Sequence, residues 1–410
     1  MVASIRVEHA TLVDSGRAVA PRVRSEALGH GCAVRAFAGP AGTEHFLTLT
    51  PPVELGFAEQ VVWLAQHYDD AQRSLGLDPD TAVFRRIYVS DAPNQSPLVR
   101  ASPLFSEPAA GPVAVSIVQQ PPLAGAKVAL LAYHIETDTP LAKRQLAPNH
   151  VLVQKAGFGH LWSTRLCSGL SDQPAPTAVQ TREIFRELTA ALSRQSATLA
   201  DNCVRTWIYV KDVVVFYQEM VASRLELFEE HGLNRHTHYI ASTGIEGACE
   251  HRYDTVLMDG YSVIGLSEAQ VAYLNDLSRL CYTKDYNVTF ERGVRIAYAD
   301  RAHQFISGTA SIDASGRVVH VGDVGRQLER ALGNVDALLH AGDASLDDLT
   351  HLIVYLRDPA DYLFAQAYLA ERFPDLPTLM LRGAVCRPQW LIEVEGIGIT
   401  ANHAPHLPSF

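Results

Sequence analysis

Three stretches of the sequence resemble one another: AVFRRIYVSD (82–91), CVRTWIYVKD (203–212) and LTHLIVYLRD (349–358). In each, a tyrosine is followed by an aliphatic residue, a variable residue and an aspartate, at Tyr88–Asp91, Tyr209–Asp212 and Tyr355–Asp358. Their β-branched and aromatic residues are typical of strands. Because the pattern returns three times, the sequence predicts three copies of one structural unit.

The sequence around each of these strands repeats as well. A stretch with helical periodicity precedes each strand, at 56–76, 177–197 and 321–342. A second helical stretch follows, which is short and interrupted by proline at 94–107 and long at 213–232 and 360–373. Each unit closes with a strand, at 128–135, within 252–265 and at 391–399, and opens with a strand pair, clearest at 294–313. The predicted order is therefore ββαβαβ, three times.

Such a unit is an α+β fold, with helices on one face of a sheet and an apolar face that must be covered. Three units in one chain can cover each other by closing into a pseudo-trimeric barrel with its helices outside. We place the three units at 1–140, 141–285 and 286–410, with crossing loops at 137–150 and 281–293. The alternative is three separate α/β domains on a string, but the connections are short and unlike linkers.

Composition restricts the function. The chain has 410 residues and a net charge of −11, which argues against broad binding to nucleic acids or anionic membranes. A small anionic substrate remains possible, because a local arginine cluster can act within an acidic protein. The six cysteines are scattered and form no CxxC pair, so we expect reduced thiols. Neither a signal peptide nor a membrane span is visible, so we expect a cytoplasmic protein. We also expect a monomer or a weak dimer of pseudo-trimers.

The third unit resembles the Rid (YjgF) superfamily. The resemblance rests on FISGTASID (305–313), the 318–339 stretch, VYLRD (354–358) and LIEVEG (391–396), about 110 residues in all. Rid proteins are homotrimers with active sites in the clefts between subunits. The resemblance therefore implies that clefts between the three units of this chain are the places to look for a site.

The last two units together resemble the chorismatase family, which cleaves chorismate into pyruvate and a ring product. The matching stretches are RTWIYV (205–210), YQEMVASR (217–224), ASTGIEG (241–247), FISGTASI (305–312), HVGDV (320–324) and VCRPQWLIEVEG (385–396). The pocket-lining loop of that family corresponds here to YTKDYNVTFERGVRIAY (282–298), which departs from it clearly. This departure bears on the substrate and not on the fold.

Glu393 and Glu395 alternate along the closing strand of the third unit and share one face with aliphatic residues. Carboxylates on such a face are costly unless they are paired or used. The resemblance implies that Glu393 is the general acid, which a raised pKa would suit; the alternative is an ion-pair partner. Glu395 is interpreted as structural. Because VALLAYHI (128–135) holds no carboxylate, we expect one working glutamate site.

Arg224 lies on the apolar stripe of its predicted helix, with Met220 and Phe228 one turn away on either side. The same position in the third unit is Leu369. A guanidinium where a sibling unit has leucine indicates a clamp for a substrate carboxylate, the role that the resemblance also implies. The alternatives are a side chain that reaches solvent or pairs with a glutamate, either Glu219 or Glu393.

Cys386 and Arg387 precede Glu393 closely. By resemblance, Cys386 together with Gly308 marks the chorismatases that form 3-hydroxybenzoate, because glycine leaves room for the ring and a thiolate can assist a rearrangement. A buried, inert cysteine is the alternative. Arg387 either binds substrate or pairs with a carboxylate.

Four further residues are candidates for substrate binding: Tyr282, Arg292, Thr243 and Gly244. Tyr282 matches a pocket tyrosine of the family, and Arg292 matches an arginine loosely, although both can be ordinary loop residues. Thr243 and Gly244 fit a tight turn whose backbone N–H groups face an anion, and turn formation alone explains them equally well.

We expect neither a metal nor a cofactor. His236, His238, Cys249 and His251 are close in sequence, but no further ligand has a recognised spacing. The sequence contains no Walker A loop, no GxGxxG after a strand and no GxSxG elbow.

The leading hypothesis is a chorismatase-like enzyme that releases pyruvate from chorismate, leaving 3-hydroxybenzoate or a dihydroxycyclohexadiene carboxylate. Arg224, with Arg292 or Arg387, would hold the carboxylates. A second hypothesis is a Rid-type hydrolase or deaminase of another enamine, imine or enol ether. Rid deaminases bind the substrate carboxylate through an arginine about 15 residues before the glutamate, where this chain has Thr378. The third is a non-enzymatic metabolite-binding protein.

Overall fold

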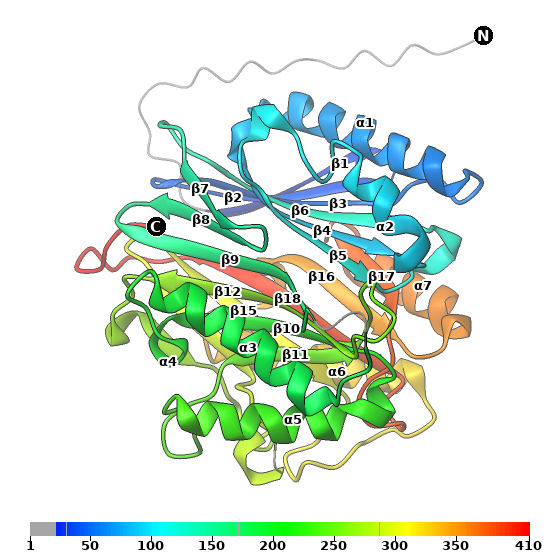
Figure 1. Cartoon of the computed structure of the whole chain (residues 1–410), viewed down its shortest axis with the longest axis vertical. Helices are drawn as coiled ribbons and strands as arrows, with labels where there is room; N and C mark the ends of the chain where they lie inside the picture. The colour runs from blue at the N-terminus through cyan, green and yellow to red at the C-terminus, as the bar shows by residue number, and fades with distance from the viewer. Residues whose placement is uncertain (1–21, 30, 170–172, 287) are drawn as a thin grey trace.

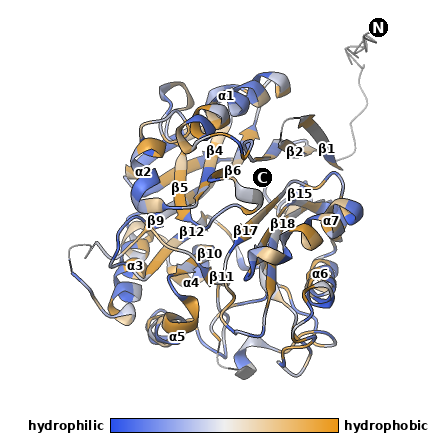
Figure 2. Cartoon of the chain, turned by 90° about the vertical axis from the view of Figure 1, so that its right-hand side faces the viewer, coloured by the Kyte–Doolittle hydropathy of each residue, from blue (hydrophilic) through white to orange (hydrophobic). Residues whose placement is uncertain are grey.

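The computed structural model describes residues 22–29, 31–169, 173–286 and 288–410. These residues form three six-stranded mixed sheets, one for each unit that the sequence predicts. Figure 1 shows the three units in succession along the chain, from blue through green to red. In Figure 2 the sheets gather around the middle of the molecule and the helices lie outside. The three-unit α+β fold is confirmed.

The first unit has the strand order β1-β2-β3-β6-β4-β5. Two helices pack on this sheet, and the second is the short one expected around the proline. In chain order the elements are β1 (Arg22–Gly29), β2 (Cys32–Gly39), β3 (Gly42–Leu49), α1 (Phe57–Leu75), β4 (Ala82–Val89), α2 (Ala92–Arg100), β5 (Ala114–Gln119) and β6 (Val128–Glu136).

The second unit repeats this order as β7-β8-β9-β12-β10-β11, written from the other edge. Its long second helix, α5, was expected from the sequence. The elements are β7 (Ala142–Ala147), β8 (His150–Lys155), β9 (Phe158–Leu166), α3 (Thr177–Ser193), α4 (Leu199–Asn202), β10 (Cys203–Val210), α5 (Val213–Glu230), β11 (Ala241–Glu246) and β12 (Val256–Ile264).

The third unit has the order β13-β14-β15-β18-β16-β17. Its first strand lies upstream of residue 286, so the third sheet begins before the expected boundary. The elements are β13 (Val271–Tyr273), β14 (Gly293–Ala297), β15 (Arg301–Ala310), α6 (Val324–His340), β16 (Leu349–Leu356), α7 (Tyr362–Arg372), β17 (Thr378–Arg382) and β18 (Ile392–Ala401).

Each unit contains a strand that the sequence did not predict, between its second helix and its closing strand. This strand is β5, β11 or β17, and it pairs in parallel with the tyrosine-bearing strand β4, β10 or β16. All three are short, from five to six residues, which leaves little room for a diagnostic alternation. The tight turn expected at Thr243 and Gly244 is therefore wrong, because both residues lie within β11. The loop expected at 137–150 likewise contains β7.

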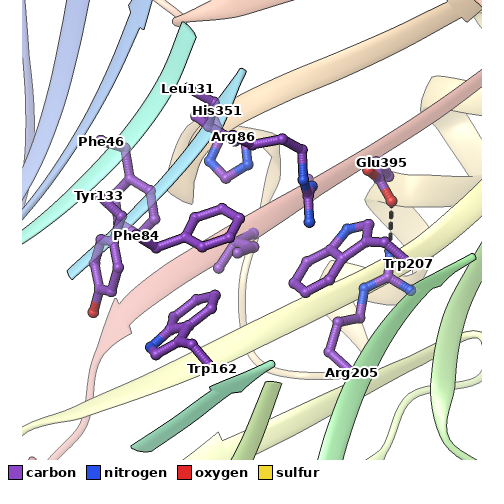
Figure 3. Close-up of a pocket in the computed structure, with 12 residues that line it drawn as sticks. Phe46, Phe84, Arg86, Leu131, Tyr133, Trp162, Arg205, Trp207, His351 and Glu395 are labelled. Carbon is purple, nitrogen blue, oxygen red and sulfur yellow. Dashed lines mark hydrogen bonds and ion pairs between the residues drawn. The ribbon is translucent and has the colours of Figure 1, made fainter. Parts of the chain in front are cut away.

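Aromatic side chains fill the space where the three sheets face one another. Figure 3 shows Phe46, Phe84, Tyr133 and Trp162 grouped on one side of this space, with Trp207 on the other. The cavity left between them is only about 20 Å³, room for about one water molecule. The barrel centre is thus a packed core with no room for a small-molecule substrate. No helix in the described ranges is long and apolar enough to cross a membrane.

Candidate active site

A polar cavity of about 270 Å³ opens between the second and third units. One wall comes from α5 and β11 of the second unit. The other comes from the segment 288–292, from β15 and from the chain that leads into β18. The lining residues are Tyr217, Gln218, Arg224, Ser242, Gly244, Val288, Phe290, Arg292, Gly308, Ala310, Ile312, Cys386, Arg387, Trp390 and Glu393.

Glu393 is the carboxylic acid that lines this cavity. It lies near the start of β18, opposite Tyr355 of β16, and its side chain is only 6% exposed. Burial, and then the negative charge of Glu395, raise the pKa of Glu393 to about 8, although Arg205 and Arg292 oppose the shift. The side chain is therefore protonated at neutral pH and can act as an acid.

Gly308 of β15 makes room for this carboxyl group. A Cβ atom at position 308 would lie 2.3 Å from Oε1 of Glu393 and 2.9 Å from Cγ2 of Thr243. Only a residue without a side chain fits there. The sequence interpretation that Gly308 leaves room for a substrate ring thus has a nearer reason, which is the space that Glu393 itself occupies.

Glu395 points to the same side of β18 but is fully engaged with protein partners. Arg205 of β10 forms an ion pair with it at 2.5 Å, drawn as a dashed line in Figure 3. The Tyr355 hydroxyl donates a hydrogen bond to it at 2.7 Å, and the Thr243 hydroxyl donates another. The structural role expected for Glu395 agrees with these contacts, and its charge acts on Glu393 from a fixed position.

Thr243 belongs to this supporting network and does not line the cavity. Its hydroxyl oxygen accepts a hydrogen bond from the backbone N–H of Gly308 at 2.8 Å and one from Arg205 at 2.5 Å. It therefore connects β11 of the second unit to β15 of the third. Gly244, the next residue, does line the cavity, and a Cβ there would lie 2.9 Å from the Tyr217 ring.

Arg224 projects from α5 into the cavity wall and is 1% exposed. Its Nε donates to the Thr289 hydroxyl at 2.8 Å, and its Nη1 donates to the Ser242 hydroxyl at 3.4 Å. Among the described residues, no carboxylate lies within ion-pairing distance of this guanidinium. Arg224 therefore does not form the ion pair with Glu219 or Glu393 that the sequence left open. Burial lowers the pKa of Arg224. A buried cation with neutral partners favours an anionic ligand.

Two more arginines line the cavity. Arg292 is 3% exposed and donates to the carbonyl oxygen of Cys281 at 3.3 Å. Arg387 donates to the carbonyl oxygen of Gly316 at 3.0 Å and lies over the Trp390 ring, 4.8 Å from its centroid. Both carry positive charge to the same cavity as Arg224, which raises the preference for an anion.

Cys386 lines the cavity as a partly buried thiol. Burial, and then the negative charge of a nearby Glu393, raise the pKa of this thiol to about 12. The neutral thiol is therefore the form present at neutral pH, which disfavours the thiolate considered from the sequence. Tyr282 is 44% exposed and is not among the residues that line the cavity.

Sequence reasoning missed several residues of this site. Ser242 and Thr289 hold Arg224, and Phe290 and Trp390 supply aromatic surface. The supporting Arg205 was missed although it had a signal, an arginine within the otherwise apolar strand CVRTWIYV. The serine and threonine carried no such signal, because small hydroxyl residues occur throughout the chain.

The other two units lack an acid at the equivalent position. The closing-strand residue opposite the conserved tyrosine is Ala129 in the first unit, Leu257 in the second and Glu393 in the third. The short parallel strands can be compared in the same way. Thr378 of β17 corresponds to Ser242 of β11, because each is paired with the residue three positions before the tyrosine of its unit. Neither position holds a cation.

Comparison with known proteins agrees with this fold. Residues 294–400 match the family described as Endoribonuclease L-PSP. A relative from Acinetobacter baylyi, described as 3-aminoacrylate deaminase RutC, is 32% identical over 95 residues, which cover 23% of this chain and 75% of that protein. The chain belongs to the Rid (YjgF, or L-PSP) superfamily.

Solved structures extend the likeness beyond one Rid unit. A chorismatase crystal structure matches with a TM-score of 0.58 at 19% identity, covering 78% of this chain and 93% of that one. The fold of this Rid protein is therefore chorismatase-like over most of its length. RidA from the Antarctic bacterium Psychrobacter sp. PAMC 21119 matches 32% of this chain and 99% of its own, at 17% identity and a TM-score of 0.28.

Proposed function

We propose that this Rid protein is a chorismatase-type enzyme that cleaves the enolpyruvyl ether of chorismate, with Glu393 as general acid. One observation carries the proposal: a protonated, buried carboxyl group and a buried guanidinium without a carboxylate partner among the described residues line the same cavity. Chorismate carries two carboxylates and an acid-labile enol ether, so it matches both features. The likeness to a chorismatase fold supports this choice.

The arginines bind the substrate in this proposal. Arg224 has donors left after its bonds to Thr289 and Ser242, and it donates to one carboxylate of chorismate. Arg292 and Arg387 on the opposite wall bind the other carboxylate. The aromatic surface of Phe290 and Trp390 packs against the ring. Two carboxylates held at separate walls fix the enolpyruvyl group in place.

Glu393 then transfers its proton to the methylene carbon of the enolpyruvyl group. The C=C bond supplies the electron pair for the new C–H bond, and an oxocarbenium centre forms at the ether carbon. Water adds there, and collapse of the hemiketal releases pyruvate and a dihydroxycyclohexadiene carboxylate. Attack by the ring hydroxyl instead forms a cyclic ketal. The bond between the ketal carbon and the former ether oxygen breaks, and so does the bond between the ring and the attacking oxygen, which leaves with pyruvate. Loss of the proton from the ring carbon that bears the former ether oxygen then gives 3-hydroxybenzoate without consuming water. Gly308 with Cys386 resembles the branch that forms 3-hydroxybenzoate, and Cys386 then acts as a neutral thiol.

Incubation of the purified protein with chorismate tests the proposal. We expect pyruvate to be released, which a coupled assay detects by reducing it. We also expect one ring product, identified by chromatography against 3-hydroxybenzoate and the dihydroxycyclohexadiene carboxylate as standards. Glu393→Gln is expected to lower kcat by about 10²–10⁴-fold. Arg224→Lys is expected to raise KM by about 10-fold or more, while Arg182→Lys, at a partly exposed arginine on α3, leaves KM unchanged. No pyruvate at high enzyme concentration would refute the proposal.

A second candidate is a Rid-type hydrolase or deaminase of another enamine, imine or enol ether. It is favoured by the relative described as 3-aminoacrylate deaminase. Ser242 and Thr378 count against the usual deaminase, because neither can bind a carboxylate as an arginine does. Turnover of an enamine that survives Arg224→Ala would favour this candidate. A protein that only binds metabolites predicts instead that Glu393→Gln keeps full ligand affinity and that no substrate is turned over.

A further inference from the structure

The cleft between the first and second units is related to the active-site cavity by the pseudo-threefold repeat, but its chemistry differs. It contains a cavity of about 200 Å³. Leu257 lies there at the position of Glu393, so the acid is missing. In its place the cleft gathers two thiols and an imidazole, from Cys167, Cys249 and His251.

Three potential metal ligands meet at this cleft. The ligand atoms of Cys167, His251 and Asp254 all lie within 4.8 Å of one another. Cys167 directly follows β9, whereas the other two residues belong to the loop between β11 and β12. A turn in which the Asp254 N–H donates to the His251 carbonyl oxygen at 3.2 Å brings these two together. The fold thus joins ligands that are far apart in the sequence.

Cys249 does not belong to this group of three, but it adjoins one of its members. The Cys249 sulfur lies 3.8 Å from Oδ2 of Asp254, and we take it as the fourth ligand. The other oxygen, Oδ1, accepts a hydrogen bond from the Ser168 hydroxyl at 2.6 Å, which orients the carboxylate. Two thiols, one imidazole and one carboxylate make up a ligand set that zinc prefers.

The charge at this cluster also calls for a cation. Asp254 is 2% exposed, and no lysine, arginine or histidine among the described residues forms an ion pair with it. Its contacts with Ser168 and Cys249 are with neutral groups. Two arginines line the same cavity. Arg100 is paired with Glu250 at 2.6 Å, and Arg165 donates to the carbonyl oxygen of Pro148 at 2.9 Å. A buried carboxylate without a cationic partner is unfavourable, and a bound metal ion would balance it.

We propose that Cys167, Cys249, His251 and Asp254 bind one zinc ion that fixes the β11–β12 loop of the second unit against the end of β9. The site departs from the sequence expectation of no metal, because Cys167 and Asp254 are contributed by the fold and not by the local His/Cys spacing. His236 and His238 take no part in the cluster. The loop that carries three of these ligands also pairs with the first unit, through the bridge between Gln119 and Ala248. The ion therefore has a structural role, apart from turnover in the other cleft.

Metal analysis of the full chain tests this proposal. Protein stripped with a chelator and dialysed against zinc is expected to retain one zinc per chain, and cobalt in its place is expected to show a thiolate charge-transfer band. Cys167→Ser and His251→Ala are each expected to weaken zinc binding by about 100-fold or more. The matched controls, Cys32→Ser and His236→Ala, retain it. Zinc removal is expected to lower Tm of the wild-type chain and not that of Cys167→Ser.

Three outcomes would overturn the proposal. One is zinc content well below one per chain after reconstitution. Another is zinc affinity unchanged by Cys167→Ser and His251→Ala. The last is a Cys167–Cys249 disulfide in protein purified without reductant, found by mass spectrometry of unreduced peptides, together with no bound metal after reduction. If a variant does not fold, the cobalt spectrum of the wild-type chain still decides, since a spectrum without the thiolate band excludes these ligands.

Discussion

At the scale of single residues, the protonation of Glu393 decides what the cavity can do. Its pKa of about 8 comes from burial and from the Glu395 charge, neither of which a sequence pattern displays. Alternation along the closing strand did predict that the two glutamates share a face. It did not predict that one lines a cavity while the other is bound by Arg205, Tyr355 and Thr243. That division depends on neighbours contributed by other strands.

Replacing Glu393 by glutamine is expected to stabilise the fold at neutral pH. In the unfolded chain this carboxyl ionises above its ordinary pKa of 4.5, whereas the folded chain keeps the proton up to about 8. The folded state therefore loses relative stability as pH rises from 4.5 to 8, by about 3 kcal/mol at pH 7. Glu393→Gln is neutral throughout and avoids this loss. Urea unfolding at pH 4 and pH 8 checks this prediction. The free energies of unfolding of the wild type and Glu393→Gln are expected to differ at pH 8 only. A constant difference would contradict the raised pKa.

The rate of chorismate cleavage is expected to fall as pH rises through about 8, because the acid form of Glu393 disappears there. Glu395→Gln is expected to move this fall to lower pH, since it removes a negative charge beside Glu393 and leaves Arg205 unpaired. A pH profile of kcat for both proteins measures the shift. Thermal unfolding of the variant, run in parallel, separates loss of fold from a change in pKa. An unchanged profile in a folded variant would contradict the electrostatic account.

Gly308→Ala is expected to lower kcat by about 10-fold or more. The added methyl group would lie 2.3 Å from Oε1 of Glu393, so the carboxyl group must move, and a displaced acid transfers its proton poorly. Gly260→Ala on β12 is the matched control, because its nearest neighbour is 3.6 Å away, an ordinary contact. Steady-state kinetics of both variants provide the comparison. Equal activity of Gly308→Ala and the wild type would show that Glu393 tolerates the displacement.

At the scale of elements, periodicity located the helices closely. The stretch expected to be helical at 213–232 is α5, Val213–Glu230, and the one at 321–342 contains α6, Val324–His340. The short parallel strands escaped, because five or six residues cannot show a clear alternation. The position of α5 matters most for function, since this helix carries Arg224 and packs on β11 through Tyr217 and Gly244.

Gly244→Ala is expected to displace α5 from β11 and to weaken substrate binding. The new Cβ on β11 would lie 2.9 Å from the ring of Tyr217, through which α5 contacts β11. Because Arg224 moves with α5 whereas Glu393 lies on β18, we expect KM to rise several-fold while kcat changes less. Steady-state kinetics on chorismate separate the two parameters. A fall in kcat alone, with KM unchanged, would contradict this assignment of the helix.

At the scale of the whole molecule, a buried pair of an arginine and a carboxylate joins each two neighbouring units within the described residues. Arg86 of the first unit pairs with Asp259 of the second at 3.0 Å, and Arg205 of the second pairs with Glu395 of the third. Arg301 of the third unit pairs with Glu44 of the first at 2.7 Å, which completes the ring. Figure 3 shows Trp207 beside Arg86 and Arg205. Their guanidinium carbons lie 4.4 Å and 5.0 Å from its ring centroid.

Asp259→Asn is expected to destabilise the whole chain by roughly 3–5 kcal/mol, because the buried Arg86 loses its counter-charge. Adding Arg86→Met is expected to recover most of this loss. Urea unfolding followed by tryptophan fluorescence and circular dichroism measures both variants, and one shared transition is expected if the three units unfold together. Arg182→Ala, which removes two surface ion pairs, with Glu226 and Glu230, is the control and should change stability by less than about 1 kcal/mol. Separate transitions would indicate that the units unfold independently.

The sequence by itself determined the threefold repeat, the helices, the tyrosine-bearing strands and the closing strand with its two glutamates. These features depend on local periodicity, which short-range backbone geometry imposes on any chain. It also singled out Arg224, because a sibling unit has Leu369 at that position. The tertiary structure alone decided that Arg224 and Glu393 line one cavity, that Tyr282 lies outside it, and that Cys167 joins His251 and Asp254. Contacts across the interfaces between units depend on how three sheets close, and no local pattern encodes that closure.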